Sequence, residues 1–328
     1  MDVISHFRQE SRTYAALGFV AICVIVLPVV IDSIWVKVLT SAVIFTLAAY
    51  GISLLYSQLG LVNLSQVALI GVGGWIMLRL NYAVQLPFEL NLLVSAVITA
   101  FIGMILALPA MRMKGLYLAL ITLMVAGGFQ IIFSAIQFPN GGAGFLGVAL
   151  QSPGEMRRPL MAESDTAYLR YSIIVVVLGV MLAAAHNRGR PGRAWAMIRK
   201  SEANAMAAGV NVTLYKLWCF TLSGFLAGVS GGLLAGALKI LDAKSFPAGE
   251  SILLFALTIV GGVGHWMGAV IAGFLYRVVP AIFNNIGIDA DLSLVIFGAA
   301  LLHAIMTAPN GIAGQFSSLF QSLGRQNK

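Results

Sequence analysis

Charged side chains are scarce in this sequence. Only 10% of its 328 residues are Asp, Glu, Lys or Arg, while 59% are hydrophobic and the mean hydropathy is +0.93. A soluble globular chain carries about 25% charged residues, because its surface must stay hydrated. Intrinsic disorder needs the opposite balance, with high charge and low hydrophobicity. Both classes are therefore excluded, and the composition indicates a polytopic membrane protein.

Cysteine is also rare. Both cysteines, Cys23 and Cys219, lie within apolar runs, so we expect small buried hydrophobic side chains and no disulfide framework. The sequence has no Gly-x-x-x-x-Gly-Lys-Ser/Thr motif and no Ser–His–Asp or metal-ligand constellation. We therefore expect a chain that is not an enzyme and that binds no nucleotide, metal or other cofactor itself.

The apolar residues form long runs. A helix needs about 20 apolar residues to cross the hydrocarbon core of a bilayer. The charge-free run Val38–Leu78 is long enough for two crossings and is interrupted around Gly60. The run Ser251–Tyr276 contains four glycines near its centre, which favour a turn between two shorter helices. We predict ten transmembrane or re-entrant segments, at 14–32, 36–56, 60–78, 90–110, 116–136, 170–186, 214–238, 249–262, 267–284 and 291–308.

Basic residues predict the orientation of these segments. If both termini and the loops at 110–115, 187–216 and 261–268 are cytoplasmic, that side holds twelve basic and three acidic residues. Its net charge is then +9, against −1 for the rest of the chain. Cytoplasmic loops of membrane proteins carry such an excess, so the basic residues indicate orientation in lipid and not nucleic-acid binding. We expect an all-α polytopic protein with cytoplasmic N- and C-termini and a single integral membrane domain, 1–328.

The densest basic cluster lies in the loop 187–213. Within it, Ser201 is a candidate helix N-cap, Glu202 complements the helix dipole, and Gly209 suits the position after the helix end. One face of this short helix is small and apolar, formed by Ala203, Met206 and Ala207. Such a face suits a groove in a partner protein better than lipid. The alternative is an interfacial helix anchored in lipid by Trp195 and the arginines.

The same loop carries a family resemblance. Its segment from Gly192 to Lys216, Gly-Arg-Ala-Trp-Ala-Met-Ile-Arg-Lys-Ser-Glu-Ala-Asn-Ala-Met-Ala-Ala-Gly-Val-Asn-Val-Thr-Leu-Tyr-Lys, resembles the coupling loop of LivM-type branched-chain amino-acid ABC permeases. In that family the loop docks on the ATP-binding subunits. The spacing from Glu to Gly is one residue longer than in the general importer motif, as expected of the branched-chain subfamily. The resemblance implies a coupling role for Arg193, Ser201, Glu202, Ala203 and Gly209.

Further stretches resemble the same family, in order, over about residues 40–315. They are Gly60–Gly73, Met113–Leu123, Asn140–Gly142, Ile252–Gly264 and Pro309–Gly314. In the first stretch the family commonly has glycine and histidine where this chain has Ser65 and Gln66. Glycine-rich membrane segments serve either tight helix packing or an unwound backbone that lines a cavity. On the second interpretation, the uncharged polar residues on a substrate path are Asn63, Ser65, Gln66 and Thr122.

Arg277 is a charged residue within a predicted apolar segment. A charge in the hydrocarbon core costs several kcal/mol, so such residues pair, reach the interface or serve function. We expect Arg277 to reach outward or to pair with Asp289 or Asp291. Contact with a substrate carboxylate is the less favoured alternative.

The resemblance implies an integral permease subunit of an ATP-driven importer for branched-chain or other small amino acids. It implies four partners: a second related permease subunit, two ATP-binding subunits and a periplasmic substrate-binding protein. The location implied is the bacterial inner membrane. Closure of the ATPase pair would push on the loop at 193–209 and tilt the spans. This tilt would change the side of the membrane from which the transport path is open.

Two alternatives remain open. Permeases of the same subfamily serve urea and short-amide importers, and specificity there rests largely with the binding protein on another chain. A secondary transporter coupled to ions belongs to a different class, and such proteins usually carry ionisable residues in mid-span. Almost every predicted span here lacks one. Uptake that needs a proton gradient and no ATP would favour that class.

Overall fold

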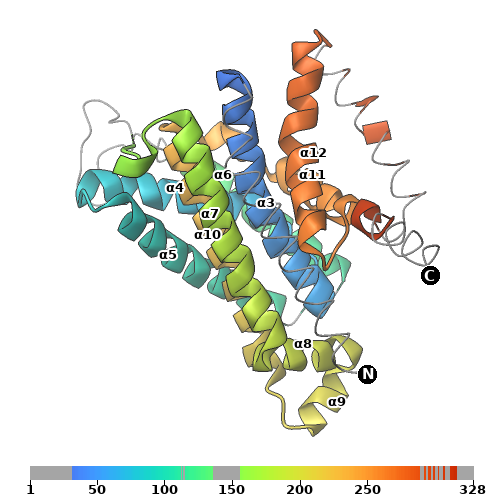
Figure 1. Ribbon diagram of the computed structural model, residues 1–328. Helices are drawn as coiled ribbons and strands as arrows, with labels where there is room; N and C mark the ends of the chain where they lie inside the picture. Colours follow the sequence, from blue (N-terminus) through green and yellow to red (C-terminus); the bar gives the residue numbers. More distant parts are fainter. Residues whose placement is uncertain are drawn as a thin grey trace, which may run out of the picture.

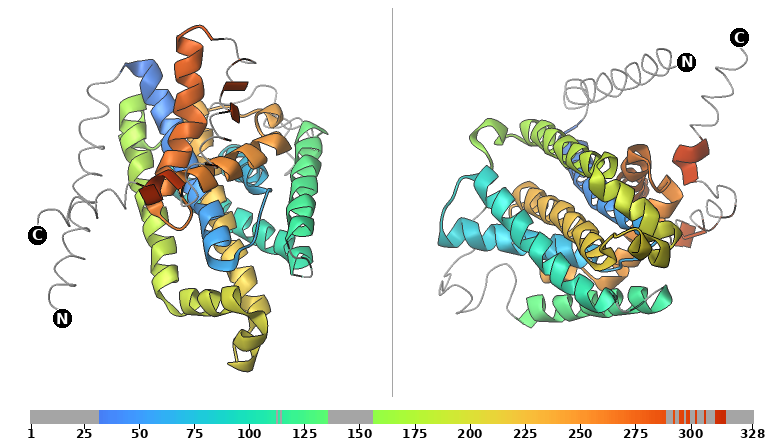
Figure 2. Two further views of the ribbon diagram at one scale, coloured as in Figure 1. Left: turned by 90° about the vertical axis from the view of Figure 1, so that its right-hand side faces the viewer. Right: turned by 90° about the horizontal axis from the view of Figure 1, so that it is seen from below.

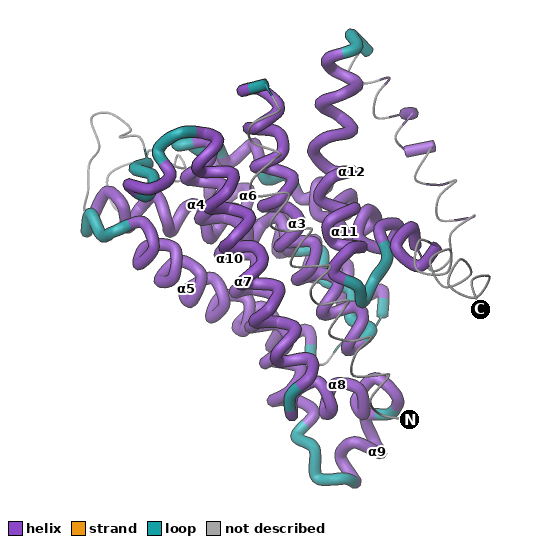
Figure 3. The backbone as a smooth tube through the Cα atoms, in the orientation of Figure 1, coloured by secondary structure: helices purple, strands orange, loops and turns teal. Residues whose placement is uncertain are grey.

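The computed structural model describes residues 32–135 except 112 and 114, residues 156–288, and residues 292, 295, 296, 298, 299, 302, 306 and 311–315. Every regular element in this part of the chain is helical (Figures 1 and 3). The elements are α3 (Ser33–Leu59), α4 (Gln66–Ala83), α5 (Phe88–Ala110), α6 (Leu116–Ala135), η2 (Leu160–Ala162), α7 (Asp165–Arg188), α8 (Arg190–Lys200), α9 (Glu202–Ala207), α10 (Val212–Leu238), η3 (Ala243–Ser245), α11 (Ala248–Gly261) and α12 (Trp266–Asn285). The predicted all-α class is confirmed for the described residues.

Six of these helices are long and apolar enough to cross a bilayer: α3, α5, α6, α7, α10 and α12. Each corresponds to one of the predicted segments, and the observed ends lie within a few residues of the predicted ones. The predicted segments 60–78 and 249–262 form α4 and the 14-residue α11. The segment 14–32 and most of 291–308 lie outside the described residues, as do both termini. The coarse membrane architecture therefore holds, whereas the number ten is untested.

Helices α3 and α10 form the centre of the bundle. They are the most buried of the candidate spans, and α10 packs against α5, α4 and α3, while α12 and α7 pack against α3. Helix α6 is the least buried of the spans and lies at the periphery (Figure 2). Long helices that are apolar on all sides belong in a buried or lipid-facing position, and the sequences of α3 and α10 fit this.

Glycines allow α10 to approach its neighbours closely. A Cβ on Gly231 would overlap the Ile70 carbonyl oxygen of α4, and a Cβ on Gly228 would lie 2.8 Å from the Ala96 Cα of α5. The facing residue of α4, Gly73, would place a Cβ 2.7 Å from the Gly228 Cα. Without a hydrophobic driving force between helices in lipid, such close backbone contact supplies much of the packing energy. For these glycines, tight packing is therefore what the structure shows.

Helix α4 begins at the level of the middle of α3 and not at its end. Helix α3 ends at Leu59, and Gly60 follows with a left-handed φ of 69°. The next five residues are not helical, and Gln66, the first residue of α4, contacts the Ala48 carbonyl oxygen halfway along α3. The sequence predicted the break near Gly60, but it placed the next helix six residues too early.

A tight turn separates α11 from α12, as the glycines predicted. Helix α11 ends at Gly261, and α12 begins at Trp266. Gly262 and Gly264 have φ of 114° and 89°, which side chains disfavour, and the Gly264 amide donates to Ser53 Oγ of α3 at 2.9 Å. The turn is therefore fixed against the same central helix.

Candidate functional site

Two short helices, α8 and α9, form an elbow at one end of the bundle, which we call the α8–α9 elbow (residues 190–207; bottom of Figure 1). Pro191 lies in the first turn of α8, where its missing N–H costs nothing. Ser201 separates the helices, and its side chain accepts a hydrogen bond from the Asn204 amide at 3.3 Å. Gly209 follows α9 with φ of 80°. The predicted N-cap, the acidic first turn at Glu202 and the glycine stop are confirmed.

Two buried side chains attach the elbow to α10. The Trp195 indole is fully buried, and its Nε1 donates to the Tyr215 carbonyl oxygen at 2.7 Å. The Lys216 ammonium, also buried, lies 2.9 Å from Glu202 Oε1. The Trp195 side chain therefore packs between the elbow and α10 and is not available to anchor the loop in lipid. The elbow is therefore joined to α10 by a hydrogen bond and an ion pair.

The outer face of α9 is exposed. Ala205 is fully buried against the protein, whereas Ala203, Met206 and Ala207 are exposed, with Met206 at 59%. Arg193 is exposed on α8. The exposed surface of the elbow thus combines a small apolar patch with basic side chains. This combination suits a partner protein with an apolar groove and acidic margins.

The second candidate site is the non-helical stretch before α4, which we call the 60–66 segment. Asn63 Oδ1 accepts hydrogen bonds from the Ser65 amide at 3.0 Å and from Ser65 Oγ at 2.7 Å. This local bonding lets the chain leave the helical conformation. Thr122 Oγ1 of α6 accepts from the Leu64 amide at 2.9 Å, so it ties the segment to a helix 58 residues away. The Leu64 and Ser65 amides thus have hydrogen-bond partners, which non-helical backbone needs at a buried position in a membrane protein.

Gln66 joins three helices at the start of α4. Its Nε2 donates to the carbonyl oxygens of Ala48 at 3.3 Å and Ser223 at 3.4 Å, and its Oε1 accepts from Ser223 Oγ at 3.2 Å. On the next residue, the Val67 amide donates to Ser251 Oγ of α11 at 3.2 Å. Sequence reasoning missed Ser223 and Ser251, because a serine in an apolar run carries no signal of its spatial neighbours.

The structure therefore brings together all four residues that the sequence placed on a substrate path. Asn63, Ser65, Gln66 and Thr122 surround one unwound segment, and none is more than 3% exposed. In this conformation their polar groups bond to one another and to the neighbouring helices. The stretch Asn140–Gly142, which also carries the family resemblance, lies outside the described residues.

Comparison with known proteins identifies the family of this chain. Residues 34–305 match the model of the family described as "Branched-chain amino acid transport system / permease component". The chain belongs to this family. The permease is 24% identical over 308 residues to the high-affinity branched-chain amino acid transport system permease protein LivM of Salmonella typhimurium, covering 84% of the chain and 69% of the relative. The LivM of Escherichia coli is also 24% identical, over 301 residues, with the same coverage of both chains.

A further relative is covered over nearly its whole length. The probable branched-chain amino acid transport permease protein LivH of Methanocaldococcus jannaschii is 26% identical over 301 residues, covering 84% of the permease and 92% of the relative. No solved structure matches the permease. The resemblance predicted from the loop and the glycine-rich stretches is thus confirmed. The chain is a multi-pass membrane permease of a transport family, which is not a class of enzymes.

Proposed function

We propose that this chain is the transmembrane permease subunit of an ATP-driven importer for branched-chain or other small amino acids. The observation that carries the proposal is the α8–α9 elbow. It presents an exposed apolar patch outward and is joined inward to α10 through Trp195 and the Glu202–Lys216 ion pair. A loop that only capped two spans would need neither feature. Family membership over residues 34–305 supplies the transport class.

The assembly that we propose contains four other chains. A second related permease completes the path, two ATP-binding subunits dock on the elbows, and a periplasmic protein delivers the substrate. In this scheme ATP is used by the partner subunits, and the permease itself binds no cofactor. The complex lies in the inner membrane, with the elbow and both termini of the permease in the cytoplasm. The positive charge of the elbow supports a cytoplasmic position for it, because cytoplasmic loops carry an excess of basic residues.

The coupling residues have separate roles in this scheme. Ser201 and Gly209 define the ends of α9, and Glu202 ties α9 to Lys216 of α10. In this scheme the exposed Ala203 lies on the face that contacts the ATPase, and the exposed Arg193 of α8 supplies positive charge to the same elbow. The ATPase binds the exposed face of α9, and the Glu202–Lys216 ion pair transmits the displacement of α9 to the bundle.

We further propose that the 60–66 segment lines the translocation path. Its support is the unwound backbone at the level of mid-α3 and the four polar side chains around it. These groups bond internally in the conformation described here, and a change in the tilt of α10 would break the Gln66–Ser223 contacts first. If Asn63→Ala and Gln66→Leu leave uptake kinetics unchanged in an assembled transporter, these residues serve packing alone.

Met206→Asp tests the coupling role without altering the fold. Met206 is exposed, so the added charge leaves the bundle intact, but it would have to be desolvated in a groove of the ATPase. We expect the permease to insert and stay folded while amino-acid uptake and co-purification of the ATPase fall about tenfold or more. Thr213→Asp places the same charge at another exposed position and is the control. Normal uptake with Met206→Asp, or with Ser201–Val210 deleted, would refute the assignment.

A further inference from the structure

A cavity of about 390 Å³ lies at the end of the bundle opposite the α8–α9 elbow. It is bounded by the first turns of α3 and α7 and by the last turns of α10 and α12. Its charged lining consists of Lys37, Arg158, Asp165 and Arg277, three cations and one carboxylate. The cavity therefore carries a formal excess of two positive charges at the end of an apolar bundle.

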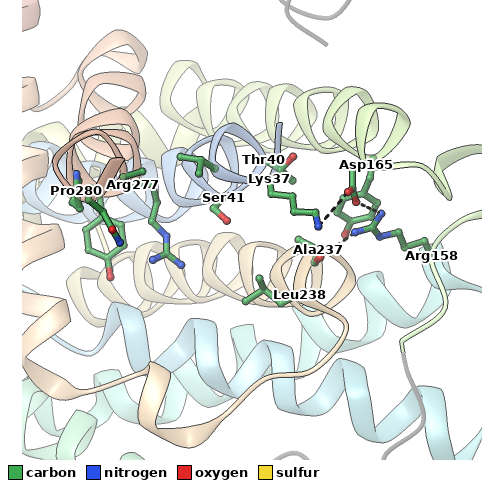
Figure 4. A pocket seen from close by; sticks show the side chains of 14 residues that line it. Lys37, Thr40, Ser41, Arg158, Asp165, Ala237, Leu238, Arg277 and Pro280 are labelled. Carbon is green, nitrogen blue, oxygen red and sulfur yellow. Dashed lines mark hydrogen bonds and ion pairs between the residues drawn. The ribbon is translucent and has the colours of Figure 1, made fainter. Parts of the chain in front are cut away.

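Two of the cations are already paired. Arg158 Nη1 lies 2.7 Å from Asp165 Oδ1, and Lys37 Nζ lies 3.6 Å from Asp165 Oδ2. The Arg158 side chain also donates to the carbonyl oxygens of Gly236 at 2.9 Å and Ala237 at 3.0 Å, which closes the end of α10. These contacts make the Lys37–Arg158–Asp165 cluster a structural clamp between helices (Figure 4).

Arg277 is different. Its guanidinium lies 4.7 Å from the ring centroid of Phe45 and 5.5 Å from that of Tyr276, and its buried Nε has no hydrogen-bond partner. Within the part of the chain that the structure describes, no carboxylate pairs with it, and its predicted partners Asp289 and Asp291 lie outside that part. Figure 4 shows the side chain reaching from α12 toward α10, apart from the clamp. Arg277 is half-buried, and a guanidinium whose buried Nε has no partner is suited to binding a planar anion.

Pro280 leaves a second polar group of the lining residues without its regular partner. Pro280 lies inside α12 and has no N–H, so the carbonyl of Tyr276 lacks the donor that a regular helix would supply. Tyr276 and Pro280 both line the cavity, next to Arg277. The lining residues thus include a donor fork that suits a carboxylate and a backbone carbonyl of the kind that accepts from an ammonium group. The remaining lining is largely apolar, including Val38, Ala237, Leu238 and Ala281.

We propose that this cavity is a binding subsite for a zwitterionic amino acid, whose carboxylate is held by Arg277. The proposal rests on the proposed function, because it assumes that the permease handles amino acids. The cavity is large enough to admit an amino acid with an aliphatic side chain. The opposite position of the elbow places this subsite at the entrance of the path, where a delivered amino acid would first contact the bundle.

The test uses the complete transporter in lipid nanodiscs, with leucine as the probe. Equilibrium binding of labelled leucine is measured without the binding protein, in competition with leucinamide, which lacks the carboxylate. We expect leucine to bind, leucinamide to compete poorly, and Arg277→Met to weaken leucine binding about tenfold or more. Arg277→Lys keeps the charge but loses the fork, so an intermediate loss is expected.

The control is Lys37→Met, which removes one positive charge from the cavity wall at a side chain that belongs to the clamp. Leucine binding that falls equally in Lys37→Met and Arg277→Met would show a general charge effect and overturn the proposal. So would unchanged leucine binding in an Arg277→Met complex that assembles normally. A loss only of binding-protein affinity would assign Arg277 to an acidic side chain of that protein, which also contradicts an amino-acid subsite.

Uptake distinguishes this proposal from the proposed function. If the wild-type complex shows no ATP-driven leucine uptake, but still binds leucine in an Arg277-dependent way, the importer assignment fails and the subsite stands. If uptake is ATP-driven and Arg277→Met alters neither binding nor the leucine dependence of uptake, the subsite fails and the importer assignment stands.

Discussion

An ion pair between Glu202 and Lys216 links the α8–α9 elbow to the central helix α10. Lys216 is 6% exposed and Glu202 Oε1 lies 2.9 Å from its ammonium, while the Glu202 side chain is one-third exposed. A buried ammonium without a counter-ion is costly, but a buried pair replaced by apolar groups is often neutral. The pair is therefore better suited to fixing the position of α9 than to adding stability.

We predict that Glu202→Gln destabilises the permease by about 1–3 kcal/mol, because Lys216 loses its counter-ion in a partly screened position. In Glu202→Gln/Lys216→Met the destabilisation should be smaller, since the uncompensated charge is gone. Thermal unfolding of the detergent-solubilised complex measures both. ATP hydrolysis should continue in the double variant with less uptake per ATP. Additive destabilisation in the double variant would contradict a direct interaction.

At the scale of elements, the glycines of α10 decide how closely the bundle packs. Gly231 contacts the backbone of α4 so closely that no Cβ fits. At Gly127 on the peripheral α6, by contrast, no neighbouring atom lies within 4 Å of the position that a Cβ would take. Both residues are glycines in apolar helices, and the sequence does not distinguish them. Their surroundings do, because α10 is central and α6 is peripheral.

We predict that Gly231→Ala destabilises the permease by about 1–3 kcal/mol, because the methyl group forces α10 and α4 apart. Gly127→Ala is the matched control, and it should be neutral or slightly stabilising, because alanine is the better helix former. The midpoint of thermal unfolding and the yield of assembled complex report on both. Equal effects of the two substitutions would show that Gly231 is not a close-packing site.

At the scale of the whole molecule, α7 separates two exposed landmarks. Met161 in η2 is 96% exposed just before α7 begins, and Ala208 is exposed directly after α9 on the elbow side. Helix α7 has 24 residues and is long enough to span the hydrocarbon core. The two landmarks should therefore lie on opposite sides of the membrane.

We predict that Ala208→Cys reacts with a membrane-impermeant thiol reagent only from the cytoplasm, and Met161→Cys only from the periplasm. The background carries Cys23→Ser, and Cys219 can stay because it is fully buried in α10. Labelling of intact cells and of inverted vesicles measures the sides. Modification of both positions from one side would refute α7 as a span, and reversed sides would refute the proposed orientation.

Local sequence patterns were enough to predict most elements. Apolar runs located α3, α5, α6, α7, α10 and α12, and the glycines at 261–264 predicted the turn between α11 and α12. The caps at Ser201 and Gly209 were equally readable, because capping depends on a few adjacent residues. The resemblance of the loop likewise led to the correct family.

The tertiary structure decided what long-range contacts control. The chain pattern did not show that α4 begins beside the middle of α3, because its first residue is fixed by hydrogen bonds to Ala48 and Ser223, far away in sequence. Nor did it show that Trp195 is buried, or that Arg277 lines the same cavity as the Arg158–Asp165 clamp without joining that ion pair. Hydropathy and capping are properties of neighbours along the chain, so the sequence specifies helices and family. Burial, ion pairing and cavities depend on which helices meet, and only the folded bundle specifies those.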